Sequence, residues 1–273
     1  MRTFGSAVMV ILSLLLTAVA VPSVWVQRNV VNEQGFVSMV DPLGGDARFQ
    51  QALTQTVAQT AVKHLDVPHG LDQAAGKLIE AAAAKLTTLP GYPAAWTETL
   101  RRSHELAFDA PADAALQLDI APLVRLLVDN ATTGLGATVP TPDQVLVTVD
   151  NSAQGTVVPL LKDIGAAAYW MLGGAVLLLV LGLLLARRRT TTLLLAGIGL
   201  AVVAGLWKVA ELVLTATLER NHLANTLLKQ FADQYQALLS QSVDRWILMA
   251  LIVAASMAAV GLVGRVLAGR APQ

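Results

Sequence analysis

Four stretches of the chain are apolar over enough residues to cross a membrane. A transmembrane helix needs about 20 predominantly apolar residues to span roughly 30 Å of hydrocarbon. The stretches of this length are residues 4–26, 166–186, 193–214 and 246–264. Each has a tryptophan near one end, where aromatic side chains collect at the membrane–water interface: Trp25, Trp170, Trp207 and Trp246. The pattern predicts four transmembrane helices.

Residues 27–165, between the first two stretches, show the periodicity of a folded helical domain. Apolar residues recur at every fourth position from Phe49 to Leu65, the spacing of one helix face. Gly44, Gly45 and Asp46 supply the turn and the cap before this helix. The helices that the spacing predicts cover residues 46–65, 72–89, about 96–107, and 122 to 134 or 136.

Two short segments of the same domain alternate between apolar and polar residues. They are "ALQLDI" at 115–120 and "QVLVTVD" at 144–150. This period of two predicts a pair of β-strands, which is marginally stable alone and therefore packs on the helices. The predicted fold class is a mainly α membrane protein with four transmembrane helices and a helical domain containing a small two-stranded β element.

Residues 215–245 predict an amphipathic helix before the fourth stretch. Its apolar stripe comprises Leu223, Leu227, Phe231, Tyr235 and Leu238. The charges on its polar face nearly cancel, whereas helices that lie on lipid usually carry a basic face. We therefore expect the stripe to pack against the 27–165 domain or against a partner protein, rather than on lipid.

The composition agrees with a membrane protein and excludes several kinds of site. Hydrophobic residues make up 55% of the chain, charged residues only 14%, and the mean hydropathy is +0.58. There is no cysteine, so disulfides, thiolate metal sites and thiol catalysis are excluded. No basic patch with interleaved aromatic residues indicates nucleic-acid binding.

The distribution of arginine predicts the orientation of the chain. Arg2, the three arginines at 187–189, Arg265 and Arg270 flank the predicted spans, and no acidic residue lies in those flanking segments. The excess of positive charge places the amino terminus, the link 187–192 and the tail 265–273 in the cytoplasm. Residues 27–165 and 215–245 are then extracytoplasmic. The larger of these segments has nine basic and fifteen acidic residues, a formal charge of −6.

The first stretch is expected to remain as a signal anchor. Ala18-Val19-Ala20 matches the small-residue pattern of a signal-peptide cleavage site. The apolar segment is longer than the usual core of a cleaved signal, which favours retention. Cleavage is the alternative, and it would leave three transmembrane helices.

Lys208 and Glu211 are a candidate ion pair near the end of the third predicted span. Lys208 lies fifteen residues after Leu193, about 22 Å along a helix and close to the far boundary of the hydrocarbon. The lysine side chain can extend to that boundary, and Trp207 beside it is a residue type of the interface. We expect an interfacial pair; the alternative is a polar site inside the bundle that moves ions or substrates.

Small residues four positions apart predict close packing between the third and fourth spans. Helices in lipid associate where small side chains allow their backbones to approach. The two rows are Gly197, Ala201 and Gly205 in the third span, and Ala250, Ala254 and Ala258 in the fourth. Their occurrence in consecutive spans favours a tight helical hairpin.

The motifs of known catalytic and metal sites are not present in the sequence. The histidines at 64, 69, 104 and 222 lack the helical pair with a glutamate that metalloproteases use. His64 and His69 flank Pro68 and fit a solvated loop better than a shared metal site. Ser103, His104 and Glu105 are consecutive, so their side chains point in different directions on a helix. We therefore expect no enzyme activity, no cofactor and no metal.

The order of these elements resembles a group of uncharacterised actinobacterial four-span integral membrane proteins with a large extracytoplasmic domain. The resemblance rests on "WVQRNVVNEQGFVSMVDPLGGDARFQQALTQTV", "LDIAPLVRLLVD" and "RRRTTTLLLAGIGLAVVAGL". It implies a bacterial cell membrane and carries over no activity and no site residue.

These observations favour a non-enzymatic protein of the bacterial cell envelope. Its extracytoplasmic domain is expected to bind another envelope or membrane protein, or a second copy of the chain, as a scaffold, assembly factor or accessory subunit. One alternative is an oligomeric transporter or channel component that uses Lys208 and Glu211. Another is an extracytoplasmic domain that binds a small ligand or lipid.

Overall fold

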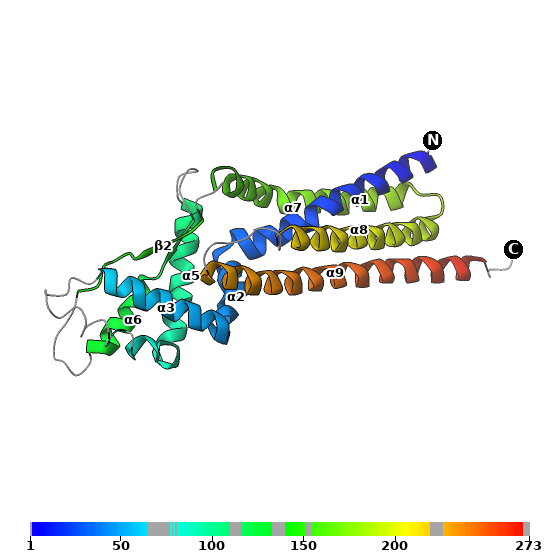
Figure 1. Cartoon of the computed structure of the whole chain (residues 1–273). Coiled ribbons are helices and arrows are strands. Elements are labelled where there is room, and N and C mark those ends of the chain that lie inside the picture. The colour runs from blue at the N-terminus through cyan, green and yellow to red at the C-terminus, as the bar shows by residue number, and fades with distance from the viewer. Residues whose placement is uncertain are drawn as a thin grey trace. The chain divides into compact units, whose positions relative to one another are not determined.

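The computed structural model describes residues 2–64, 77, 79, 81–109, 116–132, 140–150, 154–218 and 226–269 of the chain. It is mainly helical, with four long apolar helices and one small antiparallel sheet, as the sequence predicts (Figure 1). The chain divides into two compact units. The first, here called the bundle, comprises residues 1–28, 161–222 and 239–273; the second, here called the head, comprises residues 29–160 and 223–238.

Four helices have the length and composition needed to cross a membrane. They are α1 (Arg2–Val26), α7 (Gln154–Leu185), α8 (Arg189–Leu218) and α9 (Thr226–Gly269). Only 17% to 28% of the residues in their most apolar windows are buried within the protein. Most of these apolar side chains therefore face outward, where lipid would cover them. The helices indicate a multi-pass membrane protein in contact with a bilayer.

Several helix boundaries differ from those that the apolar pattern predicts. α7 begins at Gln154, twelve residues before the predicted span. α8 begins at Arg189, four residues before the predicted span, and the backbone N–H of Thr192 donates to the carbonyl of Arg188 over 3.0 Å. Polar side chains at a helix start do not interrupt its backbone hydrogen bonds, so hydropathy alone misplaces this end. α8 runs to Leu218 and so includes residues 215–218 of the predicted amphipathic helix. The described residues of that predicted helix from Thr226 onward belong to α9, which continues without a break into the fourth span.

Hydroxyl groups connect α1 to α7 inside the bundle. Ser6 Oγ donates to the carbonyl of Gly182, and Ser13 Oγ donates to the carbonyl of Ala175, each over 2.7 Å. Both serines are buried. Hydrogen bonds between helices are one of the few attractive forces available among apolar helices in lipid. The two serines, seven residues apart on one face of α1, therefore fix how α1 and α7 pack.

The backbones of α8 and α9 approach closely where glycines lie. A Cβ atom at Gly197 would lie 2.6 Å from the carbonyl oxygen of Ala254 and 2.8 Å from the nitrogen of Ala258. A Cβ at Gly261 would lie 2.6 Å from the nitrogen of Leu194. The structure therefore brings Gly197, Ala254 and Ala258 of the two predicted rows together.

The other members of the two rows lie elsewhere on the helices. Gly205 has no atom within 4 Å of the position where a Cβ would be. Ala201 and Ala250 are half-buried, and Ala250 lines a cavity described below. The contact between α8 and α9 instead continues from Ala258 toward Gly261. Gly261 is not a member of the predicted row of small residues.

The head contains the predicted two-stranded sheet. β1 (Leu116–Asp119) and β2 (Leu146–Asp150) are antiparallel, with Gln117 opposite Thr148 and Leu118 opposite Val147. The main helices of the head are α2 (Glu33–Val40), α3 (Ala47–His64), α5 (Tyr92–Asp109) and α6 (Ala121–Thr132). Short helical turns cover Gln27–Val31, Asp41–Gly45 and Leu86–Thr88.

The helices of the head agree only in part with those that the sequence predicts. Asp46 caps α3, since its Oδ1 accepts the backbone N–H of Arg48 and of Phe49 at 3.0 and 2.9 Å. α2 was not predicted; Asn32 caps it by accepting the N–H of Gly35. Of the helix predicted over 72–89, residues 77, 79 and 81–83 are helical. Residues 84–89 form a turn that includes Leu86–Thr88 instead of continuing the helix, and the rest lie outside the described residues. The predicted end of α6 at 134 or 136 also lies outside them.

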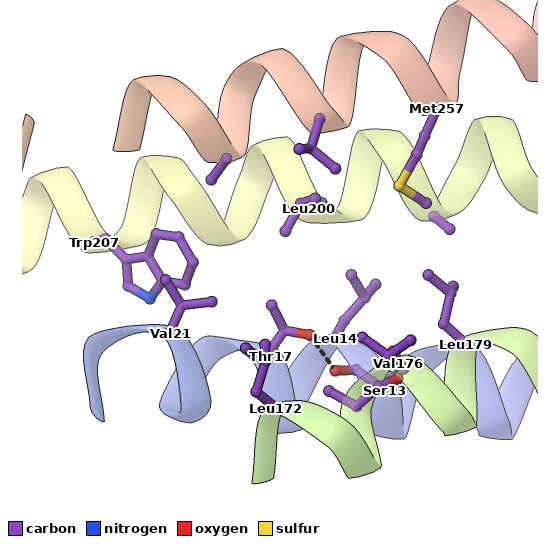
Figure 2. Close-up of a pocket in the computed structure, with 14 residues that line it drawn as sticks. Ser13, Leu14, Thr17, Val21, Leu172, Val176, Leu179, Leu200, Trp207 and Met257 are labelled. Carbon is purple, nitrogen blue, oxygen red and sulfur yellow. Dashed lines mark hydrogen bonds between the residues drawn. The ribbon is translucent and has the colours of Figure 1, made fainter. Parts of the chain in front are cut away.

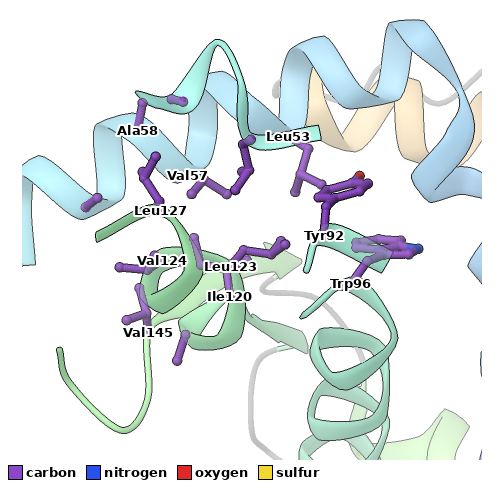
Figure 3. Packing of buried hydrophobic residues seen from close by; sticks show 14 of the residues in the cluster. Leu53, Val57, Ala58, Tyr92, Trp96, Ile120, Leu123, Val124, Leu127 and Val145 are labelled. Carbon is purple, nitrogen blue, oxygen red and sulfur yellow. The ribbon is translucent and has the colours of Figure 1, made fainter. Parts of the chain in front are cut away.

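The core of the head forms where α3, α5 and α6 meet (Figure 3). The largest fully buried side chains include Leu53 and Val57 from α3, Trp96 from α5, and Leu123 and Leu127 from α6. Figure 3 shows these side chains directed toward one another. The apolar period that predicts α3 therefore marks the face that packs into this core.

Two aromatic residues of α5 tie it to the turn at Asp41–Gly45. Trp96 Nε1 donates to the carbonyl of Asp41 over 3.1 Å, and the Tyr92 hydroxyl donates to the carbonyl of Gly44 over 3.0 Å. Burial, with the nearby charge of Asp41, raises the pKa of Tyr92 to about 12. The hydroxyl therefore keeps its proton and remains a donor at any physiological pH.

Asp119 is the buried polar centre of the head. Its Oδ1 accepts the backbone N–H of Ala121 and of Val145, each over 3.0 Å, and its own N–H donates to Ser103 Oγ. It thereby connects β1, the start of α6, the segment before β2, and α5. Arg102 lies 3.7 Å from the second carboxylate oxygen of Asp119.

Arg102 also belongs to a charged network on α5. Arg101 and Arg102 both donate to Glu98, and these hydrogen bonds lower the pKa of Glu98 to about 2. Glu98 therefore stays ionised at any physiological pH, and the network keeps its charges.

We predict that Gly197→Ala destabilises the bundle and that Gly205→Ala does not. The added methyl at Gly197 must push α9 away, which costs about 1–3 kcal/mol by analogy with overpacked cores. At Gly205 the same methyl enters open space. Thermal unfolding of the two full-length variants in one detergent compares them directly; equal melting temperatures would contradict the close α8–α9 contact.

Candidate functional site

A cluster of charged and hydroxyl side chains joins α8 to α9. Lys208 Nζ donates to Glu211 Oε2 over 3.0 Å and to Asp244 Oδ1 over 2.6 Å. Ser240 Oγ donates to Glu211 Oε1. Lys208 and Glu211 are neighbours on α8, and Ser240 and Asp244 are one turn apart on α9. These four residues are called the charged cluster below.

The sequence singled out only half of the charged cluster. Lys208 and Glu211 were recognised as neighbours on one helix, whereas Ser240 and Asp244 lie on the next helix. A signal for Asp244 was present, because it stands two residues before Trp246 at the start of the fourth predicted span. Since consecutive spans turn back at the same side of a membrane, a carboxylate there lies near the end of the third span.

The distance from the start of α8 to the charged cluster is close to the thickness of a membrane's hydrocarbon core. From Arg189 to Lys208 is nineteen residues, about 28 Å of helix at 1.5 Å per residue. A hydrocarbon core is about 30 Å thick, so a membrane boundary at Arg189 would put the opposite boundary near Lys208. The boundary is therefore closer to Lys208 than the sequence pattern indicates.

Two tryptophans at this level connect α1 to the other helices of the bundle. Trp25 Nε1 donates to Ser242 Oγ of α9, and Trp207 Nε1 donates to the carbonyl of Ala18 in α1, each over 3.0 Å. Tryptophan prefers the interface because its ring is apolar and its N–H needs a polar partner. Here those partners are groups of neighbouring helices, so α1, α8 and α9 are joined at this end.

The balance of charge and exposure limits what the charged cluster can do. The side chain of Lys208 is 40% exposed and that of Asp244 is 50% exposed, whereas that of Glu211 is 9% exposed. Glu211 is the buried member, and it accepts hydrogen bonds from both Lys208 and Ser240. Lys208 is already shared between two carboxylates. The arrangement is that of a helix-connecting ion network at the edge of the bundle.

The other residues considered for catalysis have separate roles within the head. Ser103 Oγ donates to the carbonyl of Thr99, and His104 Nε2 lies 2.9 Å from the carbonyl of Val30. The His104 ring stacks on Phe108, with centroids 4.4 Å apart. Within the described residues, no group of three His, Asp or Glu side chains could hold a metal ion. His69 and His222 lie outside those residues.

The apolar stripe on the amphipathic helix is partly used inside the chain. Tyr235 and Leu238 of α9 pack against the core of the head. Of the two surfaces expected for the stripe, the 27–165 domain and a partner protein, these two residues therefore pack on the first. Leu223 lies outside the described residues, as do the side chains of Leu227 and Phe231.

A cavity of about 270 Å³ lies between the four long helices (Figure 2). Leu14 of α1, Leu172 of α7, Leu200 of α8 and Met257 of α9 line it, and Figure 2 shows them facing the same space. No pattern in the sequence predicts this cavity, because it depends on how four helices pack.

Comparison of the chain with models of protein families, with curated proteins and with solved structures finds no match. The function is therefore argued from the residues and their geometry.

We predict that Lys208→Ala loosens the bundle without altering ion permeability. Loss of the ammonium leaves the buried Glu211 with Ser240 but without its cation, so the melting temperature of the purified protein should fall by several degrees. Lys208→Arg should retain most of the stability, and Arg245→Ala, at an exposed position beside the cluster, should have little effect.

Measurements of ion flux on the same variants distinguish a structural ion pair from a site that moves ions or substrates. In liposomes, Lys208→Ala and the unaltered protein should give the same background ion leak. A leak or transport activity that requires Lys208 would contradict the structural role.

Proposed function

We propose that this is a four-span protein of a bacterial cell membrane, with both termini in the cytoplasm and the head on the outer side. Three observations support this orientation. Arg187 and Arg188 stand between α7 and α8, Arg189 begins α8, further arginines lie near both termini, and acidic residues are missing from those segments. The charged cluster lies far along α8 from Arg189, beginning nineteen residues after it at Lys208. The layout resembles that of actinobacterial membrane proteins, which supports a bacterial source.

We also propose that α1 is retained as a transmembrane helix. Ser6, Ser13 and Ala18 all take part in hydrogen bonds with α7 or α8. Cleavage after Ala20 would remove all three connections and leave the carbonyls of Gly182 and Ala175 without these donors. The packing of the bundle therefore favours an anchor over a cleaved signal.

The proposed activity is non-enzymatic: the head binds another membrane or envelope protein, as a scaffold or accessory subunit. The observation that carries this proposal is the outer face of α3. Residues 49–62 contain no charged side chain. Gln51, Gln55 and Gln59 are exposed one turn apart, and Val62 is 42% exposed. These four side chains are called the glutamine face below.

The glutamine face shares one property with the centres of protein interfaces, the lack of charged side chains. Charged residues are depleted where proteins bury surface against one another, because each buried charge loses its hydration. By contrast, the segment 27–165, which contains most of the head, carries a formal charge of −6. The opposite side of α3 is fully occupied by the head core, so a partner has only the outer side to use.

The structure offers less support for transport. Lys208, Glu211 and Asp244 are paired with one another within the charged cluster. Among the described residues, those that line the cavity between the helices carry no charge. A pathway for ions or polar substrates would require charged or polar groups facing that interior.

We predict that Gln55→Lys abolishes recovery of the partner. A lysine in the middle of the glutamine face would have to be buried in the complex without a counter-charge, which is costly. Tagged full-length protein is cross-linked in native membranes, affinity purified, and its partners are identified by mass spectrometry. The matched control is Gln144→Lys, the same substitution at an exposed position of the head outside α3.

The outcomes of this experiment separate the possibilities. A partner recovered with the native chain and with Gln144→Lys, but lost with Gln55→Lys, supports the proposal. A partner that survives Gln55→Lys places the contact elsewhere. Repeated recovery of the native chain without any partner counts against a scaffold.

A further inference from the structure

The position of the cavity along α8 matches the hydrocarbon core of a membrane. Along α8 its lining runs from Ala196 to Trp207, which is about 10 to 27 Å from the start of the helix at Arg189. Both limits fall within the roughly 30 Å of a hydrocarbon core. The cavity is partly open at the surface of the bundle. The medium that reaches this opening in a membrane is lipid hydrocarbon.

The polar side chains that line the cavity are already used as donors within the protein. Ser13 Oγ donates to the carbonyl of Ala175, Thr17 Oγ1 to the carbonyl of Ser13, and Trp207 Nε1 to the carbonyl of Ala18. The remaining lining side chains are apolar. A buried water needs about 2–4 polar partners, and this lining leaves too few for a cluster of waters. The chemistry of the cavity suits a hydrocarbon.

The size of the cavity is sufficient for part of a lipid chain. An engineered apolar cavity of about 150 Å³ in another protein stays dry and binds benzene. The cavity here, about 270 Å³, is larger and extends along several turns of α8. An elongated space of this kind fits a flexible chain better than a compact ring.

We propose that the cavity between α1, α7, α8 and α9 is a binding site for the acyl chain of a bilayer phospholipid. The chain enters through the open side and fills the space beside Leu200 and Met257. Trp207 closes the end nearest the charged cluster, where its N–H is fixed on Ala18. This site is independent of the glutamine face and of any partner of the head.

The site is tested with the full chain reconstituted in phospholipid vesicles. A fraction of the phospholipid carries a photoactivatable diazirine on one acyl chain, and adducts are mapped by mass spectrometry after irradiation. Labelling at Leu200 and Met257 is divided by labelling at Leu262, which is 53% exposed on the outside of the bundle. We expect clear labelling at both cavity residues in the native chain.

Filling the cavity should remove that labelling. Ala250 lines the cavity, so Ala250→Phe, or the smaller Ala250→Leu if phenylalanine prevents folding, should lower the normalised labelling severalfold. Ala255→Phe is the matched control, because Ala255 is exposed on the same helix and lies outside the lining. It should leave the labelling unchanged.

Two results would overturn the proposal. One is labelling of Leu262 without labelling of Leu200 or Met257 in the native chain, which would mean that no acyl chain enters. The other is unchanged labelling of the cavity residues in a folded Ala250→Phe or Ala250→Leu variant, which would mean that the label reaches them by another route.

Discussion

The structure of the bundle depends on the weak attraction between apolar helices in hydrocarbon. Lipid tails are as apolar as leucine, so bringing two such helices together gains no hydrophobic free energy. Association has to come from close backbone contact and from hydrogen bonds between helices. α8 and α9 use the first at Gly197 and Gly261, and α1 and α7 use the second at Ser6 and Ser13. The charged cluster follows the same constraint, because each of its charges has a partner on the same or the neighbouring helix.

The head is stabilised in the opposite way, by an apolar core in water. α3, α5 and α6 bury one face each, and Asp119 satisfies the backbone groups where the strands and α6 meet. α9 contributes to both units: Tyr235 and Leu238 join the core of the head, and residues from 239 onward belong to the bundle. Because part of its apolar stripe is used within the chain, the glutamine face of α3 becomes the surface that a partner is proposed to bind.

Much of the fold could be predicted because the signals were local. Apolar length predicted the four long helices, the four-residue period at Phe49, Leu53 and Val57 predicted α3, and the alternation around Leu118 and Val147 predicted the strands. The ends of α8 and the start of α9 were missed, because polar residues within a helix do not change its backbone pattern.

The candidate sites were predicted less completely because they depend on contacts between helices. Lys208 and Glu211 are three residues apart and were found, whereas Asp244 and Ser240 come from another helix. Gly205 fits the small-residue spacing but faces open space, while Gly261 falls outside the predicted row and makes the contact. Spacing identifies which residues share a face of one helix; which face meets a neighbour is decided by the packing of the whole bundle.

The most direct test of a four-span protein with an outer head uses the absence of cysteine from the chain. A single cysteine is introduced by Asp143→Cys in the head, where the side chain is fully exposed, or by Arg188→Cys between α7 and α8. Intact cells are treated with a membrane-impermeant maleimide before and after permeabilisation. The account predicts labelling of the position 143 variant in intact cells, and of the position 188 variant only after permeabilisation. Labelling in the reverse order, or of both positions in intact cells, would contradict it.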